Sequence, residues 1–174
     1  MLKVTVDAMD EDQSIGLAAP SFGTQSLLSF VGGQITVAGA NFDVTDVSVQ
    51  GDNGLKTDRY FLRSNTLKKE PVHNSFRAFT GTLTAEFTDL SAYNRYVNGT
   101  LASVTATWVG AQIEAVTPTY FYTLQVTMPQ VRFDGETPDI SGPDIITQSL
   151  PFKALWDGTT SPVTVLYRTT DTTE

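Results

Sequence analysis

The stretch AFTGTLTAEFT, residues 78–88, alternates between two kinds of side chain along its length. Its odd-numbered positions are apolar or glycine, whereas its even-numbered positions from Thr80 onward are threonine or glutamate. A period of two is typical of a β-strand that buries one face and exposes the other to water. The stretch therefore predicts a half-buried strand, whose polar face carries Thr80, Thr82, Thr84 and Glu86.

Two later segments, residues 101–109 and 120–128, repeat this alternation. Apolar side chains occupy one side of each segment, and mostly polar side chains occupy the other. The polar positions are Ser103, Thr105 and Thr107 in the first segment, and Thr123, Gln125 and Thr127 in the second. Weaker apolar patterns predict two short strands around the turn at residues 39–41, and further strands within residues 145–155 and 163–169.

One short helix is predicted directly after the first of these alternating strands. Apolar residues recur at helical spacing from Leu90 to Val97. Before them, Thr88 or Asp89 can accept a hydrogen bond from the first free backbone N–H groups. After them, Gly99 can take the left-handed conformation that ends many helices. The sequence therefore predicts a mainly β chain with one helix.

The composition indicates an ordinary globular chain of 174 residues, with 40% apolar and 17% charged residues. Residues 1–33 are predicted to form a loosely ordered N-terminal arm, and residues 34–174 carry the strand patterns. Residues 129–144, rich in proline, glycine and acidic residues, predict an irregular connection. The chain has no cysteine, which excludes disulfides and thiol chemistry. No apolar run predicts a signal peptide or a membrane span.

The segment KTDRYFLRSNTLKKEPVHNSFR, residues 56–77, is positively charged in an acidic chain. Only Asp58 and Glu70 oppose its six basic residues, so the segment nets +4 while the whole chain nets −8. The basic residues are Lys56, Arg59, Arg63, Lys68, Lys69 and Arg77. We expect residues 50–77, called the basic loop below, to project as a long loop or hairpin. Opposite charges on one chain favour head-to-tail contacts between copies, although such a loop can also be a simple solvated surface.

The reactive groups of the sequence argue against catalysis. The single histidine, His73, lies in the basic loop, where a lone histidine is more often a surface residue than a catalyst. Four acidic residues lack the spacing of a calcium loop and favour a solvated connection instead: Asp134, Glu136, Asp139 and Asp144. Phosphate-binding and nucleophile motifs are absent from the sequence. No enzyme activity, cofactor or metal site is predicted.

The polar faces of the alternating strands allow two interpretations. They carry Thr, Ser and Gln with one Glu and no Lys or Arg, which is common on the solvent face of an antiparallel sheet. Alternatively, the sheets of several copies join edge to edge into a large barrel, which removes their exposed edges. Its lumen then offers a DNA backbone no cation to bind. A pI near 4.5 equally argues against a dedicated DNA-binding protein.

Taken in order, these patterns resemble the tail tube proteins, or major tail proteins, of long-tailed bacteriophages. The resemblance covers roughly residues 34–170 and consists of diffuse patterns. The motifs that carry it are Asn53-Gly54-Leu55, Phe79-Thr80-Gly81-Thr82-Leu83-Thr84-Ala85-Glu86-Phe87 followed by the helix from Leu90 to Val97, Tyr122-Thr123-Leu124-Gln125-Val126-Thr127-Met128-Pro129, and Leu150-Pro151-Phe152-Lys153-Ala154-Leu155-Trp156-Asp157-Gly158. Many members are longer, so residues 1–33 correspond to a divergent arm or to the remnant of a larger N-terminal part.

The resemblance implies a mainly β fold: a β-sandwich or partial barrel with one short flanking helix and the basic loop projecting from the domain at 34–174. It implies a structural protein of the virion tail, assembled in the host cytoplasm into stacked homo-oligomeric rings of six subunits. Four strands per subunit would line a lumen that conducts DNA, and the ten polar residues named above for residues 78–88, 101–109 and 120–128 are the lumen-facing candidates. The basic loop would reach a neighbouring subunit or ring.

The same resemblance implies which partners to expect. They are further copies of this chain and the tape measure, tail terminator and distal tail proteins, with DNA only in transit and no membrane insertion. Two other functions remain open. Another ring-forming tail component, such as a distal tail or terminator protein, is one. A monomeric β-sandwich that binds carbohydrate through exposed aromatic residues is the other, although such residues are more often buried. The aromatic candidates are Tyr60, Phe61, Tyr120 and Phe121.

Overall fold

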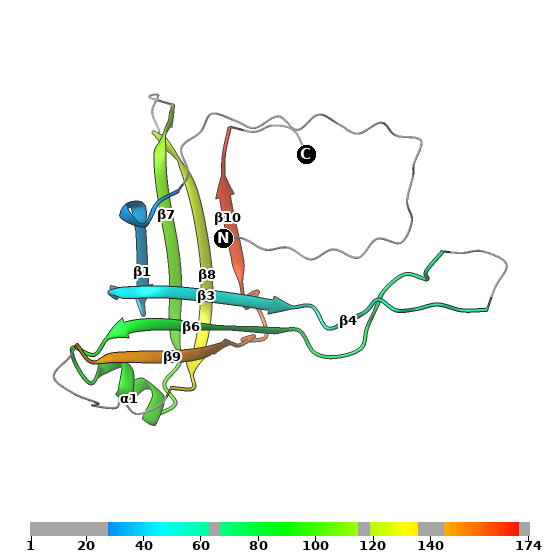
Figure 1. Cartoon of the computed structure of the whole chain (residues 1–174), viewed down its shortest axis with the longest axis horizontal. Coiled ribbons are helices and arrows are strands. Elements are labelled where there is room, and N and C mark those ends of the chain that lie inside the picture. Colours follow the sequence, from blue (N-terminus) through cyan, green and yellow to red (C-terminus); the bar gives the residue numbers. More distant parts are fainter. Residues whose placement is uncertain (1–27, 63–66, 115–118, 136–144, 171–174) are drawn as a thin grey trace. The chain divides into compact units, whose positions relative to one another are not determined.

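The computed structural model describes residues 28–62, 67–114, 119–135 and 145–170 (Figure 1). The chain divides into two compact units, and each is described by itself. The first unit contains residues 52–78 together with residues 1–24, and the second contains residues 25–51 and 79–174. We call the second unit the body. Most of the predicted N-terminal arm, residues 1–27, lies outside the described residues.

The described elements are mainly strands, as the sequence predicts. In chain order they are η1 (Phe30–Gly32), β1 (Gly33–Val37), β2 (Ala40–Asn41), β3 (Val44–Asp52), β4 (Leu55–Lys56), β5 (Val72–His73), β6 (Ala78–Glu86), α1 (Ser91–Val97), β7 (Ala102–Glu114), β8 (Tyr120–Phe133), β9 (Thr147–Ala154) and β10 (Thr164–Arg168). The alternating stretch at residues 78–88 contains β6. The two later alternating segments form β7 and β8, and both strands are longer than predicted.

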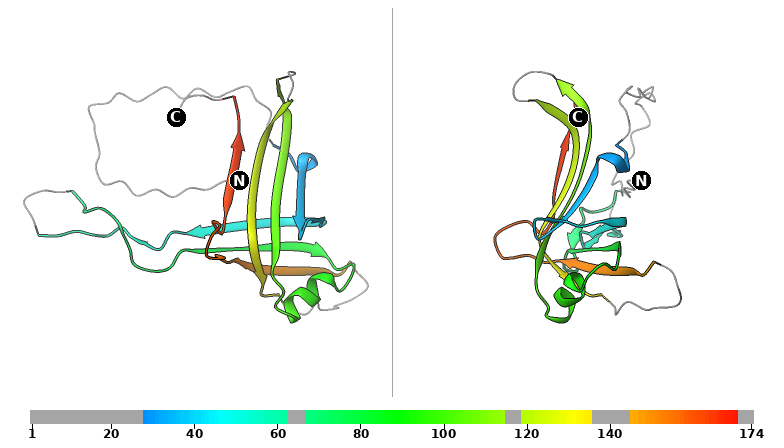
Figure 2. Two further views of the ribbon diagram at one scale, coloured as in Figure 1. Left: turned by 180° about the vertical axis from the view of Figure 1, so that it is seen from behind. Right: turned by 90° about the vertical axis from the view of Figure 1, so that its left-hand side faces the viewer.

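Strand β8 is the branch point of the sheet in the body. The strand order is β2-β1-β7-β8-β9-β6-β3, and β10 pairs with β8 as an additional branch. One edge of β8 pairs with β7, while its other edge pairs first with β10 through residues 123–127 and then with β9 through residues 131–133. Strands β3, β6 and β9 therefore run across β1, β7, β8 and β10 (Figures 1 and 2). This two-layer arrangement corresponds to the predicted β-sandwich or partial barrel.

The second half of β8 corrects the prediction that an irregular connection begins at Pro129. Ala102 of β7 pairs with Val131, and Val104 pairs with Met128. Between these two pairs β8 has two residues, whereas β7 has one. The extra residue is a β-bulge. Proline has no N–H to donate to a ladder and is tolerated in strands at such bulges. The strand can therefore pass through a proline that marks the end of a strand in most sequences.

The hydrophobic core lies between the two layers and draws on both. Leu83 of β6 and Val104 of β7 are completely buried, which confirms the inward faces that alternation predicts for these strands. Phe152 of β9 packs edge-on against Phe133 of β8, with ring centroids 6.3 Å apart. Burial of each such side chain contributes about 1.5–3 kcal/mol. The full core consists of Ile35, Val37, Leu83, Ala102, Val104, Ala106, Met128, Val131, Phe133, Leu150 and Phe152.

Helix α1 follows β6 and has the ends that the sequence predicts. Asp89 Oδ1, rather than Thr88, accepts a hydrogen bond from the Ser91 N–H at 2.7 Å, and this bond lowers the pKa of Asp89. Gly99 has φ of +61°. The N–H groups of Gly99 and of the next residue donate back to carbonyls of the last turn, which is a Schellman motif. No helix in the described residues combines the length and the apolar character that crossing a membrane requires.

In the first unit, the basic loop forms a hairpin. Strands β4 and β5 pair antiparallel, with Leu55 opposite His73. Gly54, at φ of +61°, precedes this short ladder, and its carbonyl accepts hydrogen bonds from the Asn74 and Ser75 N–H groups. The prediction of a loop or hairpin is thus resolved in favour of the hairpin. Regular structure also extends further than predicted, because β3 continues to Asp52.

Candidate functional site

Polar side chains line the face of β1, β7, β8 and β10 that points away from the core. Residues directly opposite each other in an antiparallel pair point to the same side of a sheet. The register therefore aligns one row of threonines across four strands: Thr36, Thr105, Thr127 and Thr164. A second row contains Gln34, Thr107, Gln125 and Leu166. We call the polar members of both rows, together with Ser103 and Thr123, the threonine face.

This face is polar but almost uncharged. Gln125 Nε2 donates a hydrogen bond to Thr107 Oγ1 at 3.0 Å, which fixes the amide across two strands. Within the two rows and at the residues opposite Thr123, Arg168 is the only charged described residue. Its guanidinium carbon lies 5.0 Å from the centroid of the Tyr120 ring. Further along β8, Arg132 lies between the buried Val131 and Phe133 and is a second cation that points away from the core. The threonine face therefore presents hydroxyl and amide groups, with one cation at the edge formed by β10.

The other predicted lumen candidates lie in the other layer. Thr80, Thr82, Thr84 and Glu86 occupy the polar side of β6, and the residues opposite them on β9 are Lys153, Pro151, Ser149 and Thr147. The ten candidates thus form two separate groups: six residues on β7 and β8, and four on β6. The second group has a lysine directly across the ladder. The row that contains Thr80 therefore holds two cations, Lys153 of β9 and, opposite it, Arg132 of β8.

The register also adds polar residues that the sequence reasoning missed. They are Gln34, Thr36 and Thr164, which lie in the short strands β1 and β10. Both strands are five residues long, so their alternation is too brief to stand out from neighbouring sequence. The one available signal is that Thr36 separates Ile35 and Val37, both of which are buried.

Basic side chains of the basic loop lie over its aromatic rings. Lys68 Nζ is 5.6 Å from the centroid of the Tyr60 ring. Arg59 Cζ and Lys69 Nζ are each 5.6 Å from the centroid of the Phe61 ring. A cation–π contact at an exposed site contributes about 0.5–1 kcal/mol. The loop therefore presents charge and apolar surface together.

The remaining predicted cations of the basic loop have other surroundings. Lys56 Nζ lies 3.8 Å from Asp58 Oδ1 in an exposed ion pair, which is worth little in water. Arg77 Nη2 lies 3.5 Å from His73 Nε2. Arg63 lies outside the described residues. The structure therefore describes five of the six predicted basic residues, all of them in the first unit.

The four candidate aromatic residues for carbohydrate binding are not buried. Tyr60, Phe61, Tyr120 and Phe121 are between 39% and 66% exposed, contrary to the expectation that such residues are usually buried. Two belong to the basic loop, whose short ladder is too small to bury a ring, and two begin β8. Cations already lie over the rings of Tyr60, Phe61 and Tyr120. A sugar would have to compete with these cations for the same ring faces.

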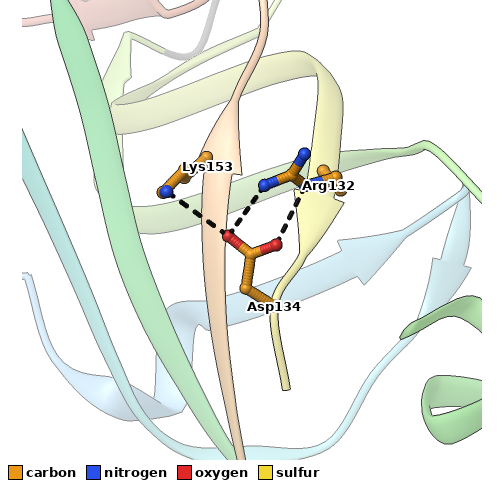
Figure 3. A network of polar contacts seen from close by, with 3 residues as sticks. All are labelled: Arg132, Asp134 and Lys153. Carbon is orange, nitrogen blue, oxygen red and sulfur yellow. Dashed lines mark hydrogen bonds and ion pairs between the residues drawn. The ribbon is translucent and has the colours of Figure 1, made fainter. Parts of the chain in front are cut away.

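An ion-pair network joins β8 to β9 (Figure 3). Arg132 and Lys153 lie directly opposite each other, and like charges in this position repel. Asp134 contacts both: its Oδ1 is 2.9 Å from Arg132 Nε, and its Oδ2 is 3.7 Å from Lys153 Nζ. The hydrogen bond from Arg132 lowers the pKa of Asp134, and the same bond raises the pKa of Arg132. Asp134, which directly follows β8, therefore links β8 to β9, and its side chain remains 35% exposed.

The other predicted acidic residues of that connection lie outside the described residues: Glu136, Asp139 and Asp144. In the described part of the chain, no group of three or more His, Asp or Glu side chains is placed to hold a metal ion. The candidate functional surfaces are accordingly the threonine face of the body and the basic loop of the first unit. The first presents hydroxyl and amide groups, and the second presents cations together with aromatic rings.

Comparisons with known proteins point to one family. A family model described as phage tail tube protein matches residues 1–154 and so includes the predicted N-terminal arm. A search of curated proteins found no match. Among solved structures, the tube terminating cap of the anti-feeding prophage is similar at 15% identity, with a TM-score of 0.58, covering 88% of this chain and 100% of that chain.

Two further similar structures come from an extracellular contractile injection system called PVC. Its sheath–tube complex in the extended state gives 12% identity and a TM-score of 0.55, covering 83% of this chain and 95% of that chain. Its sheath/tube terminator gives 11% identity and a TM-score of 0.53, covering 83% of this chain and 99% of that chain. At such identities, these likenesses concern the fold.

Proposed function

This chain belongs to the phage tail tube protein family, and from that premise we propose that it is the repeating subunit of the tail tube. In this proposal it is a structural protein without catalytic activity. Copies of the chain form homo-oligomeric rings, six subunits to a ring as in the resemblance drawn from the sequence. Stacked rings form a tube whose lumen conducts phage DNA into the host cell.

The threonine face carries this proposal. Among the described residues β10 pairs with the sheet only through β8, whereas the outer edge of β1 is already paired with the short strand β2 through Thr36 and Val37. Unpaired edges attract further strands, and closure into a barrel removes them. We infer that β10 of one subunit meets the edge formed by β1 and β2 of the next, so that β1, β7, β8 and β10 of each subunit line the lumen. The threonine face then points inward.

The chemistry of this face suits a passage for DNA. Binding to duplex DNA is driven largely by cations that neutralise phosphates. In its two rows and at Ser103 and Thr123 the threonine face has hydroxyls and amides with Arg168 opposite Thr123, whereas the row of Thr80 on β6 contains two cations, Lys153 of β9 and Arg132 of β8. We therefore assign the lumen to the six candidates on β7 and β8, together with Gln34, Thr36 and Thr164. Thr80, Thr82, Thr84 and Glu86 are assigned to a surface outside the lumen.

The proposed tube needs partners at both ends and inside. A tape measure protein, a tail terminator and a distal tail protein are the partners that the family resemblance implies, with assembly in the host cytoplasm. Negative-stain microscopy of the purified chain tests the core of the proposal. Rings or tubes with a central hole are expected. A chain that stays monomeric at millimolar concentration would contradict it, and binding to glycan arrays under those conditions would favour a carbohydrate-binding module instead.

A tube terminator is the second candidate function. Two of the similar structures are a tube terminating cap and a sheath/tube terminator. The similarity extends over 100% of the first of these chains and 99% of the second. A terminator forms a single ring that stops growth, whereas a tube protein polymerises. Adding the purified chain to preformed tubes of the same phage distinguishes the two: elongation supports the tube protein, and blocked elongation supports the terminator.

A further inference from the structure

A groove in the body lies between β1 and the start of β3. Its volume is about 790 Å³, within the range of roughly 300–1,000 Å³ that is usual for pockets that take ligands. Aromatic side chains of Phe30, Phe42 and Trp108 line it, and Asp43 and Asp46 are its charged residues. No basic residue is among the described residues that line it. We call this hollow the acidic groove.

We propose that the acidic groove of one subunit receives the basic loop of a second copy of this chain. The inference rests on the proposed function and identifies the two surfaces that join neighbouring subunits. A contact of loop to groove is heterologous, so each subunit keeps one groove and one loop for further neighbours. Such a contact can repeat throughout a tube.

Charge complementarity is the first argument for this occupant. Asp43 and Asp46 place two carboxylates at the groove, and among the described residues neither forms an ion pair with a basic side chain. The segment at residues 56–77 nets +4. Opposite charges across an interface speed encounter and fix register. The groove and the loop therefore carry opposite charges, and one chain supplies both surfaces.

Apolar surface is the second argument. Phe76 of the basic loop is 97% exposed, and Tyr60 and Phe61 are also exposed beneath their cations. The groove offers aromatic partners, since Phe30 on η1, which is 87% exposed, and Trp108 both line it. Aromatic side chains dominate the energy of protein interfaces because they bury large areas. Loop and groove thus match in apolar character as well as in charge.

Nucleic acid is the other polyanion that a basic loop with aromatic residues can bind. The observations favour a protein partner. Outside residues 56–77 the chain nets −12, so DNA that approaches the loop is repelled by the rest of the subunit. A sister subunit offers carboxylates and aromatic rings in one hollow, which DNA does not.

Reciprocal charge reversal tests the contact. One full-length variant carries K68E and K69E in the basic loop, and the other carries D43K and D46K in the acidic groove. Each alone is expected to raise the critical concentration for assembly at least about tenfold, because attraction becomes repulsion at the same sites. Mixed in equal amounts, the two variants are expected to assemble together. The two glutamates at positions 68 and 69 of the first face the two lysines in the groove of the second, and the unaltered loop of the second fits the unaltered groove of the first.

The matched control replaces Asp171 and Glu174 by lysine. It gives the same net charge as D43K/D46K but keeps both groove carboxylates. Mixed with the K68E/K69E variant, it is expected to leave most of that variant in solution. Rescue by this control would assign the effect to net charge and overturn the proposal. Normal assembly of either reversed variant, or failure of the reciprocal mixture, would overturn it as well.

Two further measurements keep the test decisive. If circular dichroism shows that D43K/D46K is unfolded, D43N/D46N replaces it, and an unchanged critical concentration then counts against the proposal. The unaltered chain is also tested for binding to a short DNA duplex. If K68E/K69E abolishes this binding and leaves assembly unaffected, the partner of the basic loop is nucleic acid and the proposal is wrong.

Tryptophan fluorescence separates this inference from the proposed function. The chain has two tryptophans, so W156F leaves Trp108, which lines the groove, as the single reporter. Its emission is expected to shift when tubes form, because the incoming loop changes the surroundings of the indole. Tubes that form without this shift would reject the groove contact and leave the tail tube function standing. Failure of the unaltered chain to form rings or tubes would reject the function itself.

Discussion

Gly81 lies where β6 passes closest to β3 and to the core. A Cβ at this position would come 2.3 Å from the Ser48 carbonyl oxygen and 2.4 Å from Cζ of the Phe152 ring. Backbone cannot yield as a flexible side chain does, so one added methyl group must displace β3 and the Phe152 ring of β9, the two neighbours of β6 in its own layer. The glycine within the alternating stretch is therefore a packing requirement that local periodicity does not reveal.

Replacing Gly81 by alanine is expected to destabilise the subunit. Overpacking of this kind costs about 1–3 kcal/mol in the free energy of unfolding, and chemical denaturation measures it. Gly135→Ala is the matched control, because there the nearest heavy atom, Leu150 Cδ2, lies 3.5 Å away, an ordinary contact. Equal stability of the two variants would show that β3 and β9 yield freely around Gly81.

Asp134 contributes to stability in a pH-dependent way. Its folded-state pKa is lowered from the ordinary value of 3.8, chiefly by the hydrogen bond from Arg132. A depressed pKa gives stability that is present above the unfolded value and is lost as the pH falls through the folded value. The link that Asp134 forms with Arg132 and Lys153 is therefore intact at neutral pH and released in strong acid.

Asp134→Asn is expected to lower the free energy of unfolding at neutral pH by about 0.2–1 kcal/mol, because the ion pairs are largely exposed and solvent screens them. The difference between the variant and the unaltered chain should shrink as the pH falls below about 3.8. Urea denaturation of both proteins at several pH values measures this difference directly. A difference that grows with acidity would contradict the assignment, because it has the wrong sign for a lowered pKa.

At the scale of elements, sequence patterns predict those features that depend on contacts between residues close together in the chain. The alternation in β6, the alternation at the start of β7, and the signals that begin and end helix α1 all correspond to the structure, since strand faces and helix ends depend on near neighbours in the chain. Register depends on partners far away in sequence. The row that aligns Thr36 with Thr105, and the passage of β8 through Pro129, therefore could not be predicted. For the same reason, the sequence did not separate the β6 candidates from those on β7 and β8.

A lysine introduced on each polar face tests which one lines the lumen. Thr105→Lys is expected to lower the infectious titre per assembled particle by about tenfold or more, because each ring then holds phosphates as DNA passes. Thr82→Lys on β6 is expected to leave the titre unchanged. Both sites are on polar faces, so tubes should still assemble in electron micrographs. Thr105→Gln controls for side-chain size without charge.

The reverse result, loss of titre with Thr82→Lys and none with Thr105→Lys, would move the lumen to the face of β6. Equal loss with Thr105→Gln would assign the effect to bulk. DNA release from purified particles, followed by fluorescence of an intercalating dye, separates slow ejection from poor adsorption.

At the scale of the whole molecule, two electrostatic effects oppose each other during assembly. Subunits that each net −8 repel, whereas a loop segment that nets +4 is attracted to acidic surface on a sister copy. Distance decides which effect is dominant. The Debye length is about 10 Å at 0.1 M salt, so the spread negative charges of two subunits are already largely screened there. Charges in direct contact are not.

Raising the salt concentration from about 0.1 M to about 0.5 M is therefore expected to slow tube growth several-fold. The Debye length falls to about 4 Å, which weakens the close attraction after the distant repulsion has already been screened. Light scattering measures the growth rate, and thermal unfolding of the unassembled subunit should change little. In a K68Q/K69Q variant the close attraction is reduced, so the same increase in salt should slow growth less. Growth of the unaltered chain that accelerates with salt would mean that repulsion between acidic subunits controls assembly, and that the basic loop acts as a solvated surface.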